Sequence, residues 1–165
     1  MPTIEVSVRR VSVVSSRPFD EILRRLTATI GHPDMHAFHS ALAAATTAAD
    51  LEDVVQGAIG SSDLMEFVRF DAGEVLRKAR GGRGPQILRL VVGNPLIMKE
   101  MAKTVPDAAS YAPITILVDE RADGVHLSYD SMASLIAPYE SEPALAVARE
   151  LDLKIVSLLE AAARR

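Results

Sequence analysis

Short stretches of the chain place hydrophobic residues at every second position, and longer stretches place them three or four residues apart. The first spacing is typical of strands with one buried face, and the second is typical of helices that pack along one side. The phase of the first alternating stretch changes at Arg9–Arg10, which predicts a bulge there. Strands are expected at residues 3–14, 64–70, 87–94, 114–121 and 125–131, with Asp123-Gly124 as a tight turn between the last two.

Helix signals separate these strands. Pro18 opens one helical stripe that Gly31 ends, and a second helix is expected to begin at Pro33. Asp50 is expected to cap a third helix, which Gly60 closes. Further helices are expected at 73–79, at 95–105 after an Asn94 cap, and at 142–163 after a Ser141 cap.

This order of elements predicts the fold class. Most strands are joined by helices, but one pair forms a tight hairpin. The pattern favours an α+β two-layer sandwich, with a mixed or antiparallel sheet and helices packed on one face. With no linker or repeat, residues 1–165 are expected to form one domain.

Composition narrows the possible partners. The net charge is −4, so there is no global basic field to attract nucleic acid, and the basic run at 77–84 is typical of a solvated loop. There is no cysteine, which excludes disulfides and thiolate chemistry. The N-terminus does not resemble a signal peptide, and no apolar run reaches the roughly 18 residues of a membrane span. We therefore expect a cytoplasmic protein that binds neither nucleic acid nor membranes.

Three of the four histidines lie within residues 31–40. If the second helix begins at Pro33, His32, His36 and His39 share one side of it, and histidines at this spacing can hold a zinc ion. The alternative is a helix edge that borders the buried stripe of Met35 and Phe38. The two interpretations predict a metal-dependent enzyme and an ordinary amphipathic helix, respectively.

The hairpin places polar residues on one side of the sheet. Strand alternation puts Arg89, His126 and Ser128 on the face opposite the core, where an arginine and a histidine could bind a carboxylate or phosphate. Asn94, at a helix N-terminus, and Tyr129 are candidates for the same ligand. The alternative is that this face is simply the solvated or dimer-facing side of the sheet.

A longer motif carries a family resemblance. It comprises Gly93-Asn94-Pro95, a helix, Pro106 and Pro113, the Asp123-Gly124 turn, and a strand that ends in Ser128-Tyr129. The stretch 62–140 resembles the domain of unknown function 302 family. The resemblance extends weakly to the first strand and helix, whereas residues 31–60 look like a helical addition to that core.

The resemblance implies a compact α+β fold and homodimers, but no established reaction or cofactor. Many relatives carry a histidine after the strand that corresponds to 64–70, where this chain has Ala72. The sequence therefore favours a non-enzymatic homodimeric module that binds a small anionic ligand or a protein partner. The alternative is a metal-dependent enzyme built on His32, His36 and His39.

Overall fold

The centre of the molecule is a five-stranded antiparallel sheet with the strand order β1-β5-β4-β3-β2. The computed structural model describes residue 1 and residues 3–164. The strands are β1 (Arg10–Ser15), β2 (Met65–Asp71), β3 (Ile87–Gly93), β4 (Ile114–Arg121) and β5 (Gly124–Asp130).

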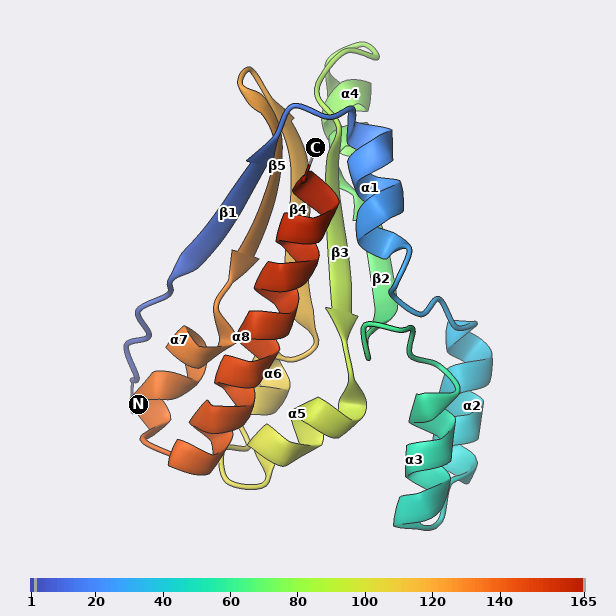
Figure 1. Ribbon diagram of the computed structural model, residues 1–165, viewed down its shortest axis with the longest axis vertical. Helices are drawn as coiled ribbons and strands as arrows, with labels where there is room; N and C mark the ends of the chain where they lie inside the picture. The colour runs from blue at the N-terminus through green and yellow to red at the C-terminus, as the bar shows by residue number, and fades with distance from the viewer. Residues whose placement is uncertain (2, 165) are drawn as a thin grey trace.

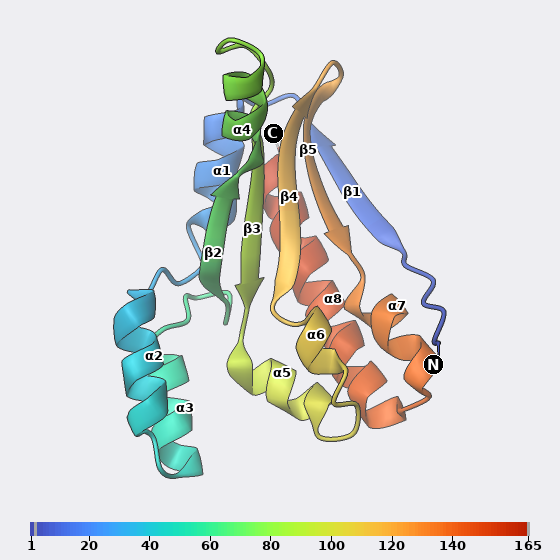
Figure 2. The same ribbon diagram turned by 180° about the vertical axis from the view of Figure 1, so that it is seen from behind.

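Helices cover only one face of this sheet. Helices α1 and α8 lie across it in Figure 1, and the view from behind shows the strands uncovered (Figure 2). We call the covered side the inner face and the other side the open face. The fold is therefore the expected α+β sandwich, with a fully antiparallel sheet. The helices are α1 (Phe19–Thr27), α2 (Met35–Ala44), α3 (Ala48–Gln56), α4 (Ala72–Ala79), α5 (Pro95–Ala102), α6 (Ala108–Tyr111), α7 (Met132–Ile136), the 3₁₀ helix η1 (Ala137–Tyr139) and α8 (Glu142–Ala163).

Helix α8 forms the main core with the inner face. Its N-cap is Ser141, as expected. Along the helix, a buried residue recurs at every third or fourth position, and these residues form one apolar stripe. Small residues near its N-terminal end allow a close approach, and larger ones fill the core further along. The predicted stripe is confirmed in full: Ala144, Ala148, Leu151, Ile155, Leu159 and Ala162.

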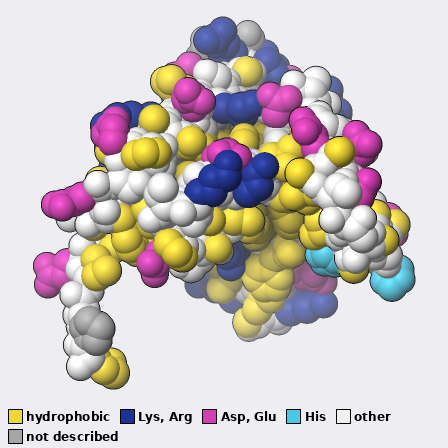
Figure 3. Space-filling view, turned by 90° about the horizontal axis from the view of Figure 1, so that it is seen from below, with side chains coloured by type: hydrophobic (Ala, Val, Ile, Leu, Met, Phe, Trp, Pro, Cys, Tyr) yellow, Lys and Arg dark blue, Asp and Glu magenta, His cyan; other side chains and the backbone are white. Residues whose placement is uncertain are grey.

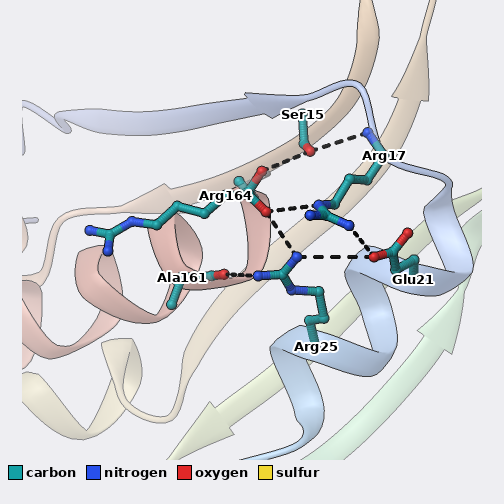
Figure 4. A network of polar contacts seen from close by, with 7 residues as sticks. Ser15, Arg17, Glu21, Arg25, Ala161 and Arg164 are labelled. Atoms are coloured by element: carbon teal, nitrogen blue, oxygen red, sulfur yellow. Dashed lines mark hydrogen bonds and ion pairs between the residues drawn. The ribbon is translucent and has the colours of Figure 1, made fainter.

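Two arginines fasten the C-terminal end of α8 to α1. Arg17 and Arg25 both donate to the Arg164 carbonyl, at 2.7 and 2.8 Å, and Arg25 also donates to the Ala161 carbonyl at 3.0 Å (Figure 4). Glu21 pairs with both guanidinium groups. Carbonyls at a helix C-terminus lack intrahelical donors and carry partial negative charge, so cations stabilise this end.

Helices α2 and α3 form a projecting arm with a core of its own. They hang below the sheet, to one side of α5 (Figures 1 and 2). Phe38, Val55 and Ala58 are buried with Met65 of β2 in a cluster separate from the main core. The arm therefore has its own hydrophobic contacts, and the chain enters and leaves it through a narrow neck.

The neck is a tight crossing of two backbone segments at Gly31 and Gly60. Both glycine amides donate to the Leu64 carbonyl, at 2.8 and 2.9 Å. A Cβ atom on Gly31 would lie 2.0 Å from the Ala58 carbonyl oxygen, and one on Gly60 would lie 2.1 Å from the Thr29 carbonyl oxygen. The two glycines are thus required by close backbone approach, not only by the helix ends that the sequence suggested.

The first strand is shorter than predicted. Only Arg10–Ser15 pair with a neighbour, and residues 3–9 do not form a strand. The reason is the length of β5, because Arg10 pairs with Asp130, its last residue. With no strand opposite residues 3–9, no bulge at Arg9–Arg10 is needed to keep one face buried.

The hairpin register also differs from the prediction. Arg121 pairs with Gly124 and Asp119 with His126, so the two turn residues are Ala122 and Asp123. Gly124 instead begins β5 with a φ of 139°, and a Cβ there would lie 2.6 Å from the Ser15 carbonyl oxygen. A turn at Asp123-Gly124 would have paired Arg121 with His126, so the pairing of β4 with β5 is shifted by two residues. Because side chains alternate with a period of two, each keeps its predicted face.

Two helix starts differ from the expected ones. The N-cap of α2 is Asp34, whose carboxylate accepts from the Ala37 amide, so the helix begins two residues after Pro33. The N-cap of α3 is Thr47, and Asp50 completes a capping box as the third helical residue. Asn94 caps α5 with Pro95 at its first position, as predicted.

We predict that Gly60→Ala destabilises the neck. The added Cβ meets a backbone oxygen that no side-chain rotation relieves, and overpacking of this kind costs about 3 kcal/mol. Thermal unfolding should occur at a lower temperature, and amide hydrogen exchange should accelerate across α2 and α3. Gly57→Ala is the matched control, since a Cβ there makes only ordinary contacts, at 3.5 Å and beyond. Equal stability of the two variants would contradict the account of the neck.

Candidate functional site

The open face combines residues from all five strands. One row crosses the whole sheet, because Phe70 pairs with Arg89, Arg89 with Leu117, Leu117 with Ser128, and Ser128 with Ser12. Paired residues in a sheet project from the same face. The predicted sharing of a face by Arg89 and Ser128 is therefore observed.

The β5 and β1 side of the open face, together with the adjoining end of β4, is largely polar and internally paired. Arg10 forms a two-pronged ion pair with Asp130 at 2.6 and 2.8 Å, and Arg121 donates to Asp119 at 2.6 Å. The Arg10 guanidinium lowers the pKa of the Asp130 carboxyl. These pairs place both signs of charge at this side of the face.

His126 and Ser128 each have a polar neighbour of their own on this side. The His126 ring lies 2.9 Å from an Asp123 carboxylate oxygen, and this hydrogen bond lowers the pKa of Asp123. The Ser128 hydroxyl lies 3.3 Å from the Ser12 hydroxyl. A base that activates a serine nucleophile forms a hydrogen bond with its hydroxyl. His126 does not form such a bond with Ser128, because its hydrogen bond is with Asp123.

The β2, β3 and β4 side of the open face is largely apolar. Val68 pairs with Val91 and Phe70 lies in the next row, with 53% and 51% of their surfaces exposed. Leu117 and Ile87 are half-buried on the same face. The structure therefore exposes a group of apolar side chains on this side of the sheet.

Arg89 lies inside this apolar side. Its side chain is exposed, and its guanidinium lies 3.4 Å from the Thr115 hydroxyl. Between residues 3 and 164, no carboxylate lies within 4.0 Å of it. Arg89 therefore differs from Arg10 and Arg121, which both have acidic partners.

The other two predicted ligand residues lie elsewhere. Asn94 is 9% exposed at the end of β3, where its side chain accepts from the Leu96 amide and donates to the Asp63 carbonyl. This capping hydrogen bond occupies one of the free backbone N–H groups at the start of α5. Tyr129 is buried on the inner face. Arg89, His126 and Ser128 share the open face, but Leu117 of β4 lies between Arg89 and Ser128. His126 and Ser128 are buried there, and Asn94 and Tyr129 lie off this face.

Tyr129 belongs to a hydrogen-bond network that sequence reasoning missed. Its hydroxyl donates to the Asp152 carboxylate at 2.6 Å, and the Met132 amide donates to the same carboxylate at 2.7 Å. The Ser131 hydroxyl donates to the other carboxylate oxygen. Asp152 thus ties α8 to the start of α7. An aspartate beside the buried Leu151 was the only sequence signal for it.

The three clustered histidines do not form the predicted metal site. His32 precedes the helix, and its ring lies 3.1 Å from the Thr27 carbonyl oxygen and 3.7 Å from Glu66. His36 and His39 are exposed on α2. In the part of the chain that the structure describes, no three histidine, cysteine or acidic side chains are arranged to hold a metal ion. The prediction was wrong because it began the helix at Pro33, where His32 would have joined the shared side.

Comparison with known proteins identifies the family. The family model "Domain of unknown function DUF302" matches residues 41–162. The chain belongs to the DUF302 family. This match extends beyond the 62–140 stretch of the sequence resemblance, into α2 and along α8.

A solved structure shares the fold. An uncharacterized conserved DUF302 protein from Bacillus stearothermophilus superposes with a TM-score of 0.64 at 13% identity, covering 94% of this chain and 98% of that chain. No curated protein matches the chain. Among the described residues, no helix of this DUF302 chain is long and apolar enough to cross a membrane.

The Tyr129 network predicts a loss of stability at high pH. Burial and the nearby Asp152 carboxylate raise the pKa of Tyr129. In the unfolded chain a tyrosine ionises near pH 10, so above about that pH the unfolded state releases a proton that the folded state keeps. The stabilisation is therefore present below about pH 10 and falls as the pH rises further.

Urea unfolding at several pH values between about 8 and 11 measures this effect. The free energy of unfolding should fall more steeply with pH for the wild type than for Tyr129→Phe. At neutral pH the variant should be about 1 kcal/mol less stable, because it loses a hydrogen bond. Tyr139 should contribute to the same fall in unfolding free energy, because the Tyr111 hydroxyl raises the pKa of Tyr139 to about 12. Tyr139→Phe measures this second contribution. Identical slopes for wild type and Tyr129→Phe would contradict the prediction.

Proposed function

We propose that this protein is a non-enzymatic homodimeric binding module of the cytoplasm, and that a second copy covers its open face. The observation that carries the proposal is the exposed apolar side of the sheet, with Val68, Phe70, Val91 and Leu117 at its centre. Covering one such side chain contributes about 1.5–3 kcal/mol when it is fully buried.

The arrangement of charge on the open face favours a second copy as the partner. In a dimer with two-fold symmetry, the same surface must complement itself. A two-fold axis that runs across the strands places the apolar sides of both copies against each other. It also brings the Arg10–Asp130 pair of one copy towards the Arg121–Asp119 pair of the other, so that each end of the polar side meets groups of both signs.

Substitutions on opposite sides of the molecule test this proposal. Phe70→Glu should convert a dimer into a monomer, measured as the mass in solution by light scattering. Each of the two glutamates removes about 2 kcal/mol of association free energy, so the dimer should weaken by about a thousandfold.

Leu153→Glu is the matched control. Leu153 is 70% exposed, but it lies on α8, which packs against the inner face. This variant should keep the mass of the wild type. A mass that falls only for Leu153→Glu would instead assign association to α8, and a monomeric wild type would remove the proposal. Circular dichroism confirms that each variant is folded.

A small anion at Arg89 is a second candidate function. The exposed guanidinium without a nearby carboxylate supports it. Arg89→Ala should weaken binding of inorganic phosphate about tenfold, as followed by amide chemical shifts, since charge-assisted hydrogen bonds are worth about 1.5–3 kcal/mol. Arg83→Ala, in the exposed loop before β3, should leave phosphate binding unchanged. Unaltered binding by Arg89→Ala would refute this candidate.

A further inference from the structure

A cavity lies where the arm meets the rest of the protein. Its volume is about 200 Å³. Phe38, His39 and Leu42 of α2 form one wall, and residues around the start of α5 and before β4 form the other, including Met98 and Pro113. In the view from below, hydrophobic side chains gather in a hollow beside the histidines (Figure 3).

The inner end of the cavity is aromatic. Phe38 is 5% exposed and meets Phe67 edge to face, with ring centroids 6.4 Å apart and planes at 90°. Phe67 lies at the bulge between Glu66 and Val68, which breaks the alternation of β2. The bulge leaves Phe67 among the arm residues while Val68 and Phe70 stay on the open face.

The other wall requires a glycine. A Cβ on Gly93 would lie 2.9 Å from the Pro113 Cβ and 3.7 Å from the Phe67 ring. The absence of a side chain at Gly93 allows Pro113 to approach β3 at the edge of the cavity. Gly93 thus allows close packing at this wall.

Two polar side chains line the cavity, Asn94 and His39, and they differ in whether they are already hydrogen-bonded. The Asn94 side chain already uses both its oxygen and its nitrogen. His32 and His126 each use a ring nitrogen, whereas within residues 3–164 the His39 ring forms no hydrogen bond. Because His39 is exposed, it lies at the solvent end of an otherwise apolar cavity.

We propose that this cavity binds a small aromatic acid, with the ring between Phe38 and Met98 and the carboxylate at His39. A dry apolar cavity of about 150 Å³ holds benzene, so the observed volume accommodates one substituted ring. Apolar walls with one placed polar group are typical of small-molecule sites. The site lies within one chain and does not depend on the open face.

Two matched probes test the site by ¹⁹F NMR. The first is 4-fluorophenylacetate, and the second is 4-fluorophenylacetamide, which has the same ring and no charge. Both should bind the wild type at one site. His39→Ala should weaken the acid about tenfold and the amide less than threefold, because only the acid gains a charge-assisted hydrogen bond. An equal effect on both probes, or none, would overturn the role of His39.

Filling the cavity tests its location. Leu42→Trp from the arm side and Met98→Trp from the other side should each abolish binding of both probes, and using both guards against one that fails to fold. Leu153→Trp, at an exposed position of α8 outside the cavity lining, should leave the dissociation constants unchanged. Probe binding should also slow amide hydrogen exchange in α2, since the ligand touches both walls. Failure of the wild type to bind either probe, or full binding by a folded tryptophan variant, would overturn the proposal.

Discussion

The alternation of side chains in the sheet, combined with helices on one face only, determines which side chains the protein presents to solvent. Helices α1 and α8 bury the inner residues of the strands, and the Arg17–Arg25 contacts hold the end of α8 in place. No helix lies over the outer residues of the same strands. Because β2, β3 and β4 carry apolar residues outward as well as inward, the uncovered side of the sheet exposes apolar as well as polar side chains.

The proposed cavity site depends on the arm. The crossing at Gly31 and Gly60 sets where α2 and α3 meet the sheet, and the bulge at Phe67 joins the arm's core to β2. The arm and the start of α5 leave a cavity between them. Phe67 and Val68 are neighbours in the chain, but Phe67 lines the cavity and Val68 lies on the open face.

Local signals in the sequence predicted much of the fold. The Asn94 and Ser141 caps, strand β3 and the buried stripe of α8 depend on residues close in the chain, and all are observed. The hairpin turn was misplaced because Gly124 meets a need that arises elsewhere, namely the close approach of Ser15 from β1. The end of β1 likewise depends on the length of β5, which no local pattern in residues 3–14 records.

The candidate sites were predictable only where strand parity decides them. The alternation of side chains places Arg89, His126 and Ser128 on one face. The same alternation places Leu117 and Val91 on that face, but whether they are exposed depends on where the helices pack. Asp152 contacts Tyr129 across 23 residues, and the cavity joins α2 to Pro113, so neither appears in a short sequence window.

Isotope-filtered NMR on a mixture of ¹³C-labelled and unlabelled protein measures which surface joins two copies. The account predicts intermolecular contacts from the methyl groups of Val68, Val91 and Leu117. Contacts that arise only from Leu153 and Val156 of α8, or no intermolecular contacts at all, would contradict it.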